Sequence, residues 1–524
     1  MVAARARVRK GQRLPFHSIL FEGVEKRAGL DQPKEPAYFS DLNLDQVAET
    51  LYEGREQYEL KPVFYRALGD VETVQYRQDV LRDIEEGDTA GYLKAFAQQM
   101  RTMRHQLRQS EDLRHQYQRE GWFLKAVDTY NAAIGRLALD LGSVGMKSRG
   151  LRAFHDYLSS YTDSAGFTTL VAEAAKVKKQ LVQVQYCLTI RGSRVTVRKY
   201  DSEGDYGADV LATFERFKQG EVKDYLVDLP QYDDMNQVEA RILDLVVRLF
   251  ADVFAALDEF CLQHREYLDE TIRVFDREVQ FYLAYADHMR PLKAAGLQFC
   301  YPLVSTSSKD VMARDTFDLA LANKLVPKKL EVVPNDLYLR DPEKIFVVSG
   351  PNQGGKTTFA RTFGQIHHLA SVGYPVPGTE ARLFLFDQLL THFEKQEDLS
   401  DLRGRLEDDV VRIQGILRMA TASSIIIMNE VFTSATVKDA RLLGTSVIER
   451  VTERGSLCVY VTFIDELSVL NDATVSIVST VLPDKPAERT YKLVRRPADG
   501  LAYAAAIAEE YGLTYDRLKG RISR

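Results

Sequence analysis

A glycine-rich segment that ends in a lysine and a threonine is the part of this sequence best suited to chemistry. It fits the phosphate-binding pattern G-x-x-x-x-G-K-[ST]. Glycines let backbone N–H groups close around phosphate oxygens, and a helix that begins directly afterwards adds a favourable field. In such a loop a lysine reaches the β and γ phosphates of ATP, and the hydroxyl binds Mg²⁺. The residues expected to contact ATP are Gly350, Pro351, Asn352, Gln353, Gly354, Gly355, Lys356, Thr357 and Thr358, with Thr357 also a metal ligand.

The sequence on both sides of this loop predicts the elements that it needs. Residues 345–348 form a short apolar run, which is typical of a buried parallel strand. After the loop, Phe359, Phe363 and Ile366 recur at helical spacing. A strand, a glycine turn and a helix therefore follow one another, as phosphate binding requires.

A second apolar run, 424–428, ends in Asn429 and Glu430. A glutamate at the end of such a strand can orient and deprotonate the water that attacks ATP, so Glu430 is the expected general base and Lys356 its catalytic partner. The preceding position normally carries an aspartate that holds Mg²⁺ or its water. Asn429 is expected to take this role here with an uncharged amide oxygen, which predicts weaker Mg²⁺ binding or a slower step.

The composition is that of an ordinary globular protein. A net charge of −6 over 524 residues excludes a uniformly basic nucleic-acid binder but allows local basic patches. The four cysteines are far apart and form no C-x-x-C pair, which argues against a zinc site or a disulfide framework and favours the cytoplasm. No apolar run approaches the roughly 18 residues that span a bilayer, so no membrane partner is expected.

Near residue 185 the spacing of apolar residues changes from helical to alternating, which predicts a β-hairpin. Tyr186, Leu188 and Ile190 alternate with polar residues, and Gly192 lies at the turn before the next alternating run. Two interpretations fit its basic flanks: a contact with DNA phosphates, or an edge hairpin that charge keeps soluble. The candidate DNA-binding residues are Arg191, Arg194, Arg198 and Lys199.

Several segments of the C-terminal half resemble the ATPase domain of the MutS family of DNA mismatch repair proteins. Residues 333–336 match V-P-N-D, and 349–358 are close to T-G-P-N-M-G-G-K-S-T. The stretch 372–377 resembles V-G-x-x-V-P, and 386–399 resembles F-D…T-R…D-D-L. Asn429-Glu430, with Asp439, follows the Walker B segment and its downstream loop. The resemblance covers roughly 330–515, and 76–83 resembles the lever region more faintly.

This resemblance implies an α/β P-loop ATPase domain of the ABC type, preceded by a mainly helical lever domain with a small β-containing clamp. It also implies ATP and Mg²⁺ as cofactors, a homodimer and DNA as a partner. The expected segments are a basic arm or, as favoured, a solvated tail (1–35), lever helices (36–184), the clamp insertion (185–235), long lever helices (236–310), the ATPase domain (311–496) and a C-terminal helical segment (497–524). Between Pro230 and Pro291 the sequence contains no Gly or Pro, and the spacing of its apolar residues predicts one or two very long helices.

Departures from the family pattern limit what the resemblance implies. The chain reaches the lever region almost at once, which puts mismatch reading in doubt. The Ser-Thr signature that contacts the partner's γ-phosphate corresponds to Gly404 and Arg405, where the arginine can replace the serine. The A-T-H switch reads Val461-Thr462-Phe463, and Phe463 cannot hydrogen-bond a phosphate. The position that faces adenine is Val332, which offers apolar contact without stacking.

The main hypothesis is a short MutS-like ATPase that couples ATP binding and hydrolysis at a dimer interface to DNA binding, in mismatch repair or in processing of recombination-type structures. The alternative is a nucleotide-gated scaffold that hydrolyses ATP weakly and binds DNA or proteins. A transporter subunit is disfavoured because no L-S-G-G-Q segment occurs, and a chromosome-maintenance ATPase would need longer coiled coils.

Overall fold

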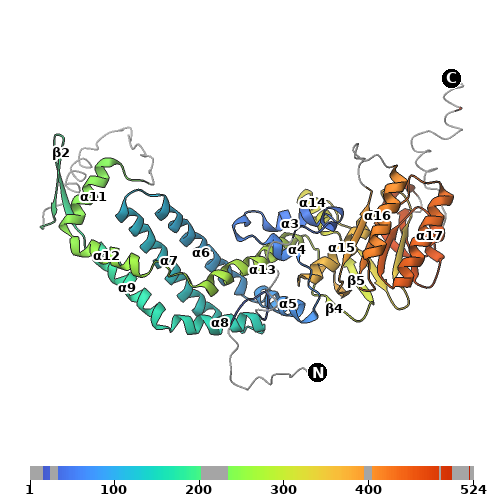
Figure 1. Ribbon diagram of the computed structural model, residues 1–524, viewed down its shortest axis with the longest axis horizontal. Coiled ribbons are helices and arrows are strands. Elements are labelled where there is room, and N and C mark those ends of the chain that lie inside the picture. Colours follow the sequence, from blue (N-terminus) through green and yellow to red (C-terminus); the bar gives the residue numbers. More distant parts are fainter. Residues whose placement is uncertain are drawn as a thin grey trace, which may run out of the picture. The chain divides into compact units, whose positions relative to one another are not determined.

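The computed structural model describes residues 16–23, 34–201, 234–394, 404–482, 485–498 and 519 (Figure 1). These residues divide into two compact units. The first takes in Phe16, Asp88–Met146 and the described parts of Ala153–Asp276. The second takes in the described parts of His17–Gly87, Lys147–Arg152 and Arg277–Arg524. The predicted segment 1–35 therefore lies largely outside the described residues, 497–524 almost wholly so, and the proposed division into six segments stays a prediction.

The first unit is mainly helical, as the helical spacing of its apolar residues predicts. Helices α6 and α7 run side by side and bury residues such as Phe96 and Ile134 between them. The rings of Phe154 and Phe275 stack with 3.4 Å between their centroids. The elements are α6 (Thr89–Asp112), α7 (Gln116–Gly142), α8 (Arg149–Thr162), α9 (Ala165–Val182), β1 (Tyr186–Arg191), β2 (Arg194–Lys199), α11 (Gln237–Leu249), α12 (Ala251–Gln263) and α13 (Glu270–Ala294), of which α8 and α13 each have residues in both units.

The prediction of one or two very long helices between Pro230 and Pro291 is wrong. Helices α11 and α12 are separated at Phe250, whose φ of −125° and ψ of 41° are not helical. A third helix, α13, then continues through Pro291, and two short strands follow it, β3 (Phe299–Cys300) and β4 (Leu303–Ser305). The absence of Gly and Pro between Pro230 and Pro291 makes a long helix possible but does not prevent a break, because tertiary packing overrides propensity.

The second unit contains a mixed six-stranded sheet in the order β10-β11-β12-β7-β13-β14. Its first five strands are parallel to their neighbours, and β14 is antiparallel to β13. The strands predicted over 345–348 and 424–428 are present as β7 and β11, with ends that differ by one residue. The strands are β10 (Leu389–Phe393), β11 (Ile425–Asn429), β12 (Leu457–Val461), β7 (Ile345–Ser349), β13 (Thr474–Leu482) and β14 (Lys485–Arg495).

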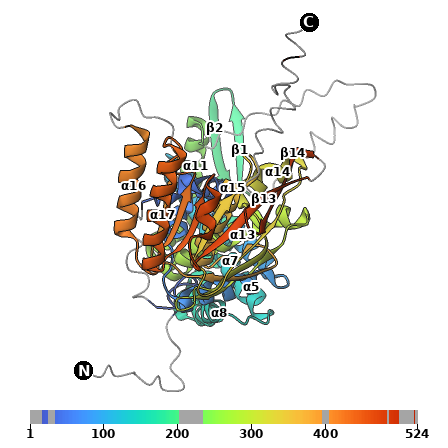
Figure 2. The ribbon, with the colours of Figure 1, turned by 90° about the vertical axis from the view of Figure 1, so that its right-hand side faces the viewer.

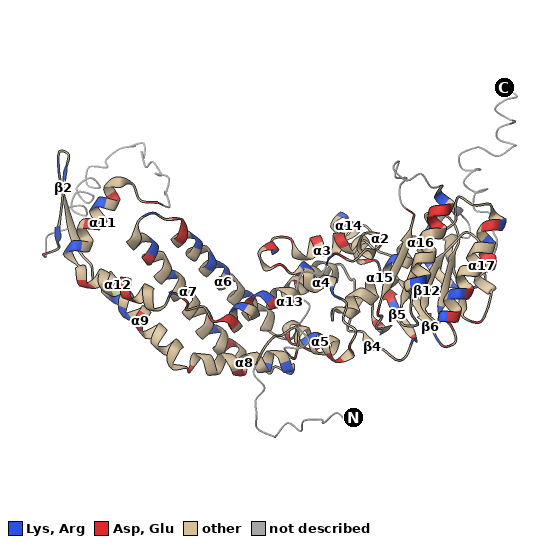
Figure 3. Ribbon diagram, in the orientation of Figure 1, with Lys and Arg blue, Asp and Glu red and all other residues tan. Residues whose placement is uncertain are grey.

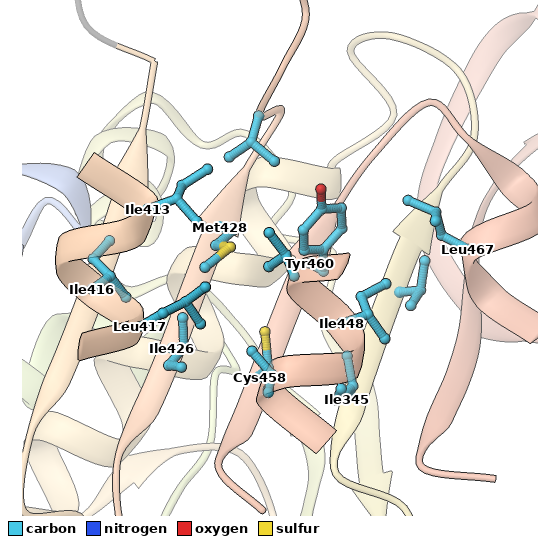
Figure 4. Close-up of a cluster of buried hydrophobic side chains, with 14 of the residues drawn as sticks. Ile345, Ile413, Ile416, Leu417, Ile426, Met428, Ile448, Cys458, Tyr460 and Leu467 are labelled. Atoms are coloured by element: carbon cyan, nitrogen blue, oxygen red, sulfur yellow. The ribbon is translucent and has the colours of Figure 1, made fainter. Parts of the chain in front are cut away.

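Helices cover both faces of this sheet, as in other α/β domains. Ile426 and Met428 belong to a buried cluster with helices α16 (Arg405–Met419) and α17 (Val437–Arg454) (Figure 4). Ile427, which points to the opposite face, lies against Gly364 of α15 (Lys356–Ser371), where an added Cβ would approach its Cδ1 to 2.8 Å. The helices α16 and α17 lie next to each other in Figure 2, on one side of the strands.

Short elements from the start of the chain and from residues 318–328 hold the other side of α15. The Gln365 amide donates to Leu42 O and to the Asp318 carboxylate, both at 2.8 Å. His368 lies between Tyr38 and Phe64, and burial lowers its pKa to about 3, so this imidazole is a neutral packing group. These elements are α2 (Tyr38–Asp41), α3 (Leu44–Tyr52), η1 (Glu56–Tyr58), α4 (Lys61–Tyr65), α5 (Val71–Glu85), α14 (Leu319–Leu325) and η2 (Val326–Lys328).

The buried Arg77 of α5 joins three separate segments of the second unit. Its guanidinium donates to Leu20 O at 3.1 Å and to Val372 O at 3.0 Å, and it lies over the ring of Phe281. Two smaller sheets complete this unit, β3-β8 and β4-β9-β5-β6. Their remaining strands are β5 (Val311–Thr316), β6 (Asn335–Leu339), β8 (Val376–Pro377) and β9 (Glu380–Phe384).

Across the described part of the chain, no helix combines the length and apolar character required to traverse a bilayer. All four cysteines are free thiols, and burial raises the pKa of Cys458 most strongly. The helical first unit and the α/β sheet of the second confirm the coarse fold class predicted from the sequence.

The two sides of α17 predict a contrast in stability. Ile448 is 1% exposed within the cluster of Figure 4, whereas Leu442 on the same helix is 71% exposed. We expect Ile448→Ala to lower the free energy of unfolding by about 2–5 kcal/mol, because it leaves a cavity. Leu442→Ala should change it by less than about 0.5 kcal/mol. Urea unfolding of both variants measures the difference, and equal losses would contradict the assigned core.

Candidate functional site

The parallel strands of the second unit bring the two predicted catalytic segments to one edge of the sheet. Val348 of β7 pairs with Val461 of β12, which pairs in turn with Asn429 of β11. All three strands are parallel, so their carboxyl ends lie together. The glycine-rich loop follows β7, and Glu430 follows β11. The loop and the glutamate, separated by about 75 residues of sequence, thus face the same space.

The glycines at 350, 354 and 355 are required by the geometry of the loop. Gly350 has φ 116° and Gly355 has φ 93°, which are conformations that other residues rarely adopt. Gly354 has no room for a side chain, since a Cβ there would come within 2.2 Å of Ser479 Oγ. That hydroxyl, on β13, donates to Gly354 O at 2.6 Å. Ser479 therefore holds the loop from the neighbouring strand, a role that the sequence analysis missed.

Lys356 is the first residue of α15 and its side chain is only 4% exposed. Its Nζ donates to Gly350 O at 2.9 Å and to Asn352 Oδ1 at 3.4 Å, and lies 3.6 Å from Glu430 Oε1. Burial lowers the pKa of this ammonium, and the negative charge of Glu430 opposes the shift. The loop therefore holds a poorly solvated cation whose most natural additional partner is an anion.

Glu430 has a left-handed backbone, with φ 52°, and its N–H donates to Val461 O at 3.0 Å. This turn directs the carboxylate from the end of β11 toward Lys356. The side chain remains 35% exposed, so water can reach it. A carboxylate in this position can accept a proton from a water molecule that lies between it and a phosphate on the loop.

Two buried polar atoms at this edge lack partners within the described structure. Asn429 Oδ1 and Ser349 Oγ are both buried and meet no hydrogen-bonding group among the described residues. A buried polar atom without a partner is costly unless a ligand or water satisfies it. Thr357, the second residue of α15, follows the loop directly and carries a hydroxyl group. Oxygen ligands of this kind suit Mg²⁺ and its waters, so the residues present fit that ion.

Arg489 of β14 places a second cation at the loop, which sequence reasoning also missed. Its Nε donates to Asn352 O at 3.1 Å, and its charge contributes to lowering the pKa of Lys356. No local motif marks this arginine. Only the pairing of β14 with β13, where Arg489 lies opposite Val481, shows that the strand brings it to the loop.

The V-P-N-D segment is tied to the same edge strand. The Asn335 side chain donates to Tyr491 O at 3.1 Å and accepts from Leu493 N at 2.8 Å. Tyr491 O is in turn close to Gly355, since a Cβ on that glycine would lie 3.7 Å away. Val332 lies half-buried three residues before Asn335, and its role toward adenine stays a prediction. Phe463, at the end of β12, is 46% exposed.

Gly404 and Arg405 lie at the start of α16, the helix on the sheet face opposite α15. Arg405 pairs with Glu394 at 3.5 Å and its side chain is 54% exposed. One turn further, Asp409 makes two partly buried contacts. Its Oδ1 pairs with His392 Nε2 at 2.8 Å, and its Oδ2 accepts from Phe432 N at 3.2 Å.

The predicted hairpin is present in the first unit, and its basic residues separate onto two faces. Arg191 pairs with Arg194, and Arg198 pairs with Cys187, so the three arginines share one face. Lys199 pairs with Tyr186 on the other face, where its Nζ lies 5.1 Å from the centroid of the Phe250 ring. All four side chains are exposed, and Figure 3 marks Lys and Arg positions along the hairpin ribbon in blue. The contact of these residues with DNA stays a prediction.

Comparison with known proteins confirms the resemblance for the C-terminal part of the chain. Residues 346–519 match the family model described as MutS domain V. The DNA mismatch repair protein MutS of Thermotoga neapolitana is 25% identical over 313 residues, covering 59% of this chain and 36% of that protein. MutS of Thermus aquaticus is 28% identical over 248 residues, which covers 46% and 28% of the two chains.

A second kind of relative is the endonuclease MutS2 of Gemmatimonas aurantiaca. It is 30% identical over 180 residues, which covers 34% of this chain and 22% of that protein. The chain thus spans about a third or less of the length of these relatives. The similarity includes the glycine-rich loop and Glu430, since both lie inside residues 346–519.

Burial of the Lys356 ammonium predicts that this residue lowers the stability of the nucleotide-free protein. Its pKa is lowered on folding, so the unfolded chain holds the proton more tightly and the penalty is greatest below the folded pKa. Lys356→Met should therefore raise the free energy of unfolding at pH 7. The gain should shrink as the pH rises from the lowered pKa toward the ordinary value of 10.5. Urea unfolding at several pH values tests this, and destabilisation by Lys356→Met at pH 7 would contradict it.

Proposed function

We propose that this chain, whose residues 346–519 match the family model described as MutS domain V, is an ATPase that couples ATP binding and hydrolysis to DNA binding as a dimer. The observation that carries the proposal is the placement of the buried Lys356 ammonium beside Glu430 at the carboxyl edge of a parallel sheet. A positively charged loop next to an accessible carboxylate is the arrangement that phosphoryl transfer to water requires.

In the proposed reaction, backbone N–H groups of residues 351–357 and the Lys356 ammonium hold the β and γ phosphates. Glu430, now released from Lys356 by the competing phosphate charge, orients a water molecule and accepts its proton as the oxygen attacks the γ phosphorus. The bond to the β-phosphate oxygen breaks, and ADP leaves with that electron pair. Arg489 supports Lys356 from β14 by adding positive charge at Asn352.

Thr357 and Asn429 are the residues that would hold Mg²⁺, and the unpartnered Asn429 Oδ1 supports this assignment. When bound, the ion neutralises charge on the β and γ phosphates. Asn429 contributes an oxygen without the charge of an aspartate, so affinity for Mg²⁺ should be lower than at a carboxylate site. Val332 is proposed to give apolar contact to adenine.

The dimer is proposed because Gly404 and Arg405 lie on the sheet face opposite α15, at an exposed helix start. A helix N-terminus with an arginine can bind the γ-phosphate held by another subunit. Two identical chains related by a twofold axis would then complete each other's sites.

DNA is proposed to contact the arginine face of the hairpin, formed by Arg191, Arg194 and Arg198. Three exposed guanidinium groups on one side of a ribbon can bind successive phosphates. Lys199 is a weaker candidate because it lies over Phe250 on the opposite face. The names of the relatives, mismatch repair protein and endonuclease, support DNA as the partner without identifying the DNA structure.

A nucleotide-gated scaffold with weak hydrolysis is the second candidate function. Asn429 and the exposed Phe463 favour it, because Asn429 carries no charge and Phe463 offers no hydrogen bond to a phosphate. In this case ATP binding alone would control contacts with DNA or proteins, and turnover would be negligible.

Removing the proposed general base separates the two candidates. Glu430→Gln keeps the shape of the side chain but cannot accept a proton, so kcat should fall about 10²- to 10⁴-fold while ATP affinity changes little. Glu449→Gln, on the exposed side of α17, removes the same charge and should leave kcat unchanged. Steady-state phosphate release measures both. Wild-type turnover no faster than that of Glu430→Gln would favour the scaffold.

Replacing the three arginines of the hairpin face by alanine should weaken DNA binding and reduce the slope of log Kd against log salt by about 3, one for each lost phosphate contact. The control changes Arg82, Arg273 and Arg290, which each pair with a carboxylate three residues away and carry the same total charge. Fluorescence anisotropy with a labelled duplex from 50 to 300 mM salt gives both slopes. An unchanged slope in the hairpin variant would refute the clamp assignment.

A further inference from the structure

We propose that Asp409 is a positioning residue that fixes the loop carrying Glu430 and connects it to the exposed start of α16. The proposal rests on the ATPase function above and concerns how that site is controlled. Asp409 itself contacts neither the glycine-rich loop residue Lys356 nor the carboxylate of Glu430 in the contacts described above, so it would act through the backbone of residues 430–432.

The backbone that follows β11 is in an unfavourable conformation. Glu430 has φ 52° and Phe432 has φ 60°, both in the left-handed region that large side chains rarely occupy. Such a backbone persists only where its surroundings hold it. Two hydrogen bonds do so: Glu430 N donates to Val461 O, and Phe432 N donates to Asp409 Oδ2 at 3.2 Å. Both acceptors belong to other elements, and the second is the one that is a side chain.

Asp409 is itself fixed by His392 of β10. The imidazole is 1% exposed, and its Nε2 lies 2.8 Å from Asp409 Oδ1. The Nδ1 atom is buried and meets no partner among the described residues. In a neutral imidazole the proton therefore resides on Nε2 and is donated to Asp409, because an unpaired acceptor nitrogen is less costly than an unpaired N–H. Each carboxylate oxygen thus has one assigned donor.

These contacts connect the two parts of the proposed dimeric site. Arg405, the residue proposed to meet the partner's nucleotide, is four residues and about one helical turn before Asp409 on α16. A small movement of this turn when Arg405 binds phosphate would be transmitted through Asp409 Oδ2 to Phe432 N and so to Glu430. Hydrolysis at one site would then depend on whether the partner's nucleotide occupies the start of α16.

The test compares Asp409→Ala with Asp408→Ala, a neighbour whose carboxylate pairs with Arg412 at the surface. We expect Asp409→Ala to lower kcat about tenfold to hundredfold, because misplacing Glu430 slows the reaction, and to leave the dissociation constant of ATP within about twofold. Asp408→Ala should change neither. In the Glu430→Gln background, Asp409→Ala should cause no further loss, since the residue acts through Glu430.

His392 provides a second test that does not remove the aspartate. His392→Gln keeps an N–H donor near the position of Nε2 and should retain most of kcat, whereas His392→Leu should lose it as Asp409→Ala does. Thermal unfolding identifies any variant that fails to fold, and the His392 pair then decides the question. If the wild type hydrolyses ATP and neither Asp409→Ala nor His392→Leu changes its kcat, the positioning role alone is overturned. Absence of hydrolysis by the wild type would overturn the proposed function and this role together.

Discussion

The burial of the Lys356 ammonium is the constraint on which the rest of the nucleotide site depends. A cation that is 4% exposed must be compensated, and here the compensation comes from Gly350 O, Asn352 Oδ1 and the carboxylate of Glu430. The carboxylate of Glu430 is available because β7, β12 and β11 are parallel and end at one edge. The same edge offers buried polar atoms at Ser349 and Asn429 that have no partner in the described structure. The site is therefore already shaped for an anion with an associated cation.

The glycine-rich loop is supported by neighbouring strands as well as by its own helix. Ser479 of β13 holds Gly354, Arg489 of β14 reaches Asn352, and Asn335 fixes the backbone of β14 at Tyr491 and Leu493. Because these contacts come from separate strands, a rigid sheet can keep the loop in a strained conformation before any ligand arrives. Such preorganisation reduces the cost of binding.

Local patterns were sufficient to predict β7, β11 and the loop between β7 and α15. Apolar runs of four or five residues identified these two strands, and the glycine spacing predicted the phosphate site. Ser479, Arg489 and the pair of His392 and Asp409 were missed, because their roles depend on strand order and register that no short pattern encodes. Tertiary structure also explains why the prediction of very long helices between Pro230 and Pro291 is wrong, since the helix breaks at Phe250 without Gly or Pro. On the hairpin, register rather than sequence separates Lys199 from the three arginines.

The coupling of nucleotide to DNA is tested most directly by measuring whether nucleotide changes the affinity of this protein for DNA. The anisotropy of labelled plain duplex, mismatched duplex and four-way junction would be measured with and without ATP and Mg²⁺. Lys356→Met would serve as the variant that cannot respond to nucleotide. We expect ATP and Mg²⁺ to change the Kd of the wild type for at least one probe by about fivefold or more. They should not change the Kd of Lys356→Met for any probe. Equal affinities of the wild type in both conditions, with ATP bound, would contradict it.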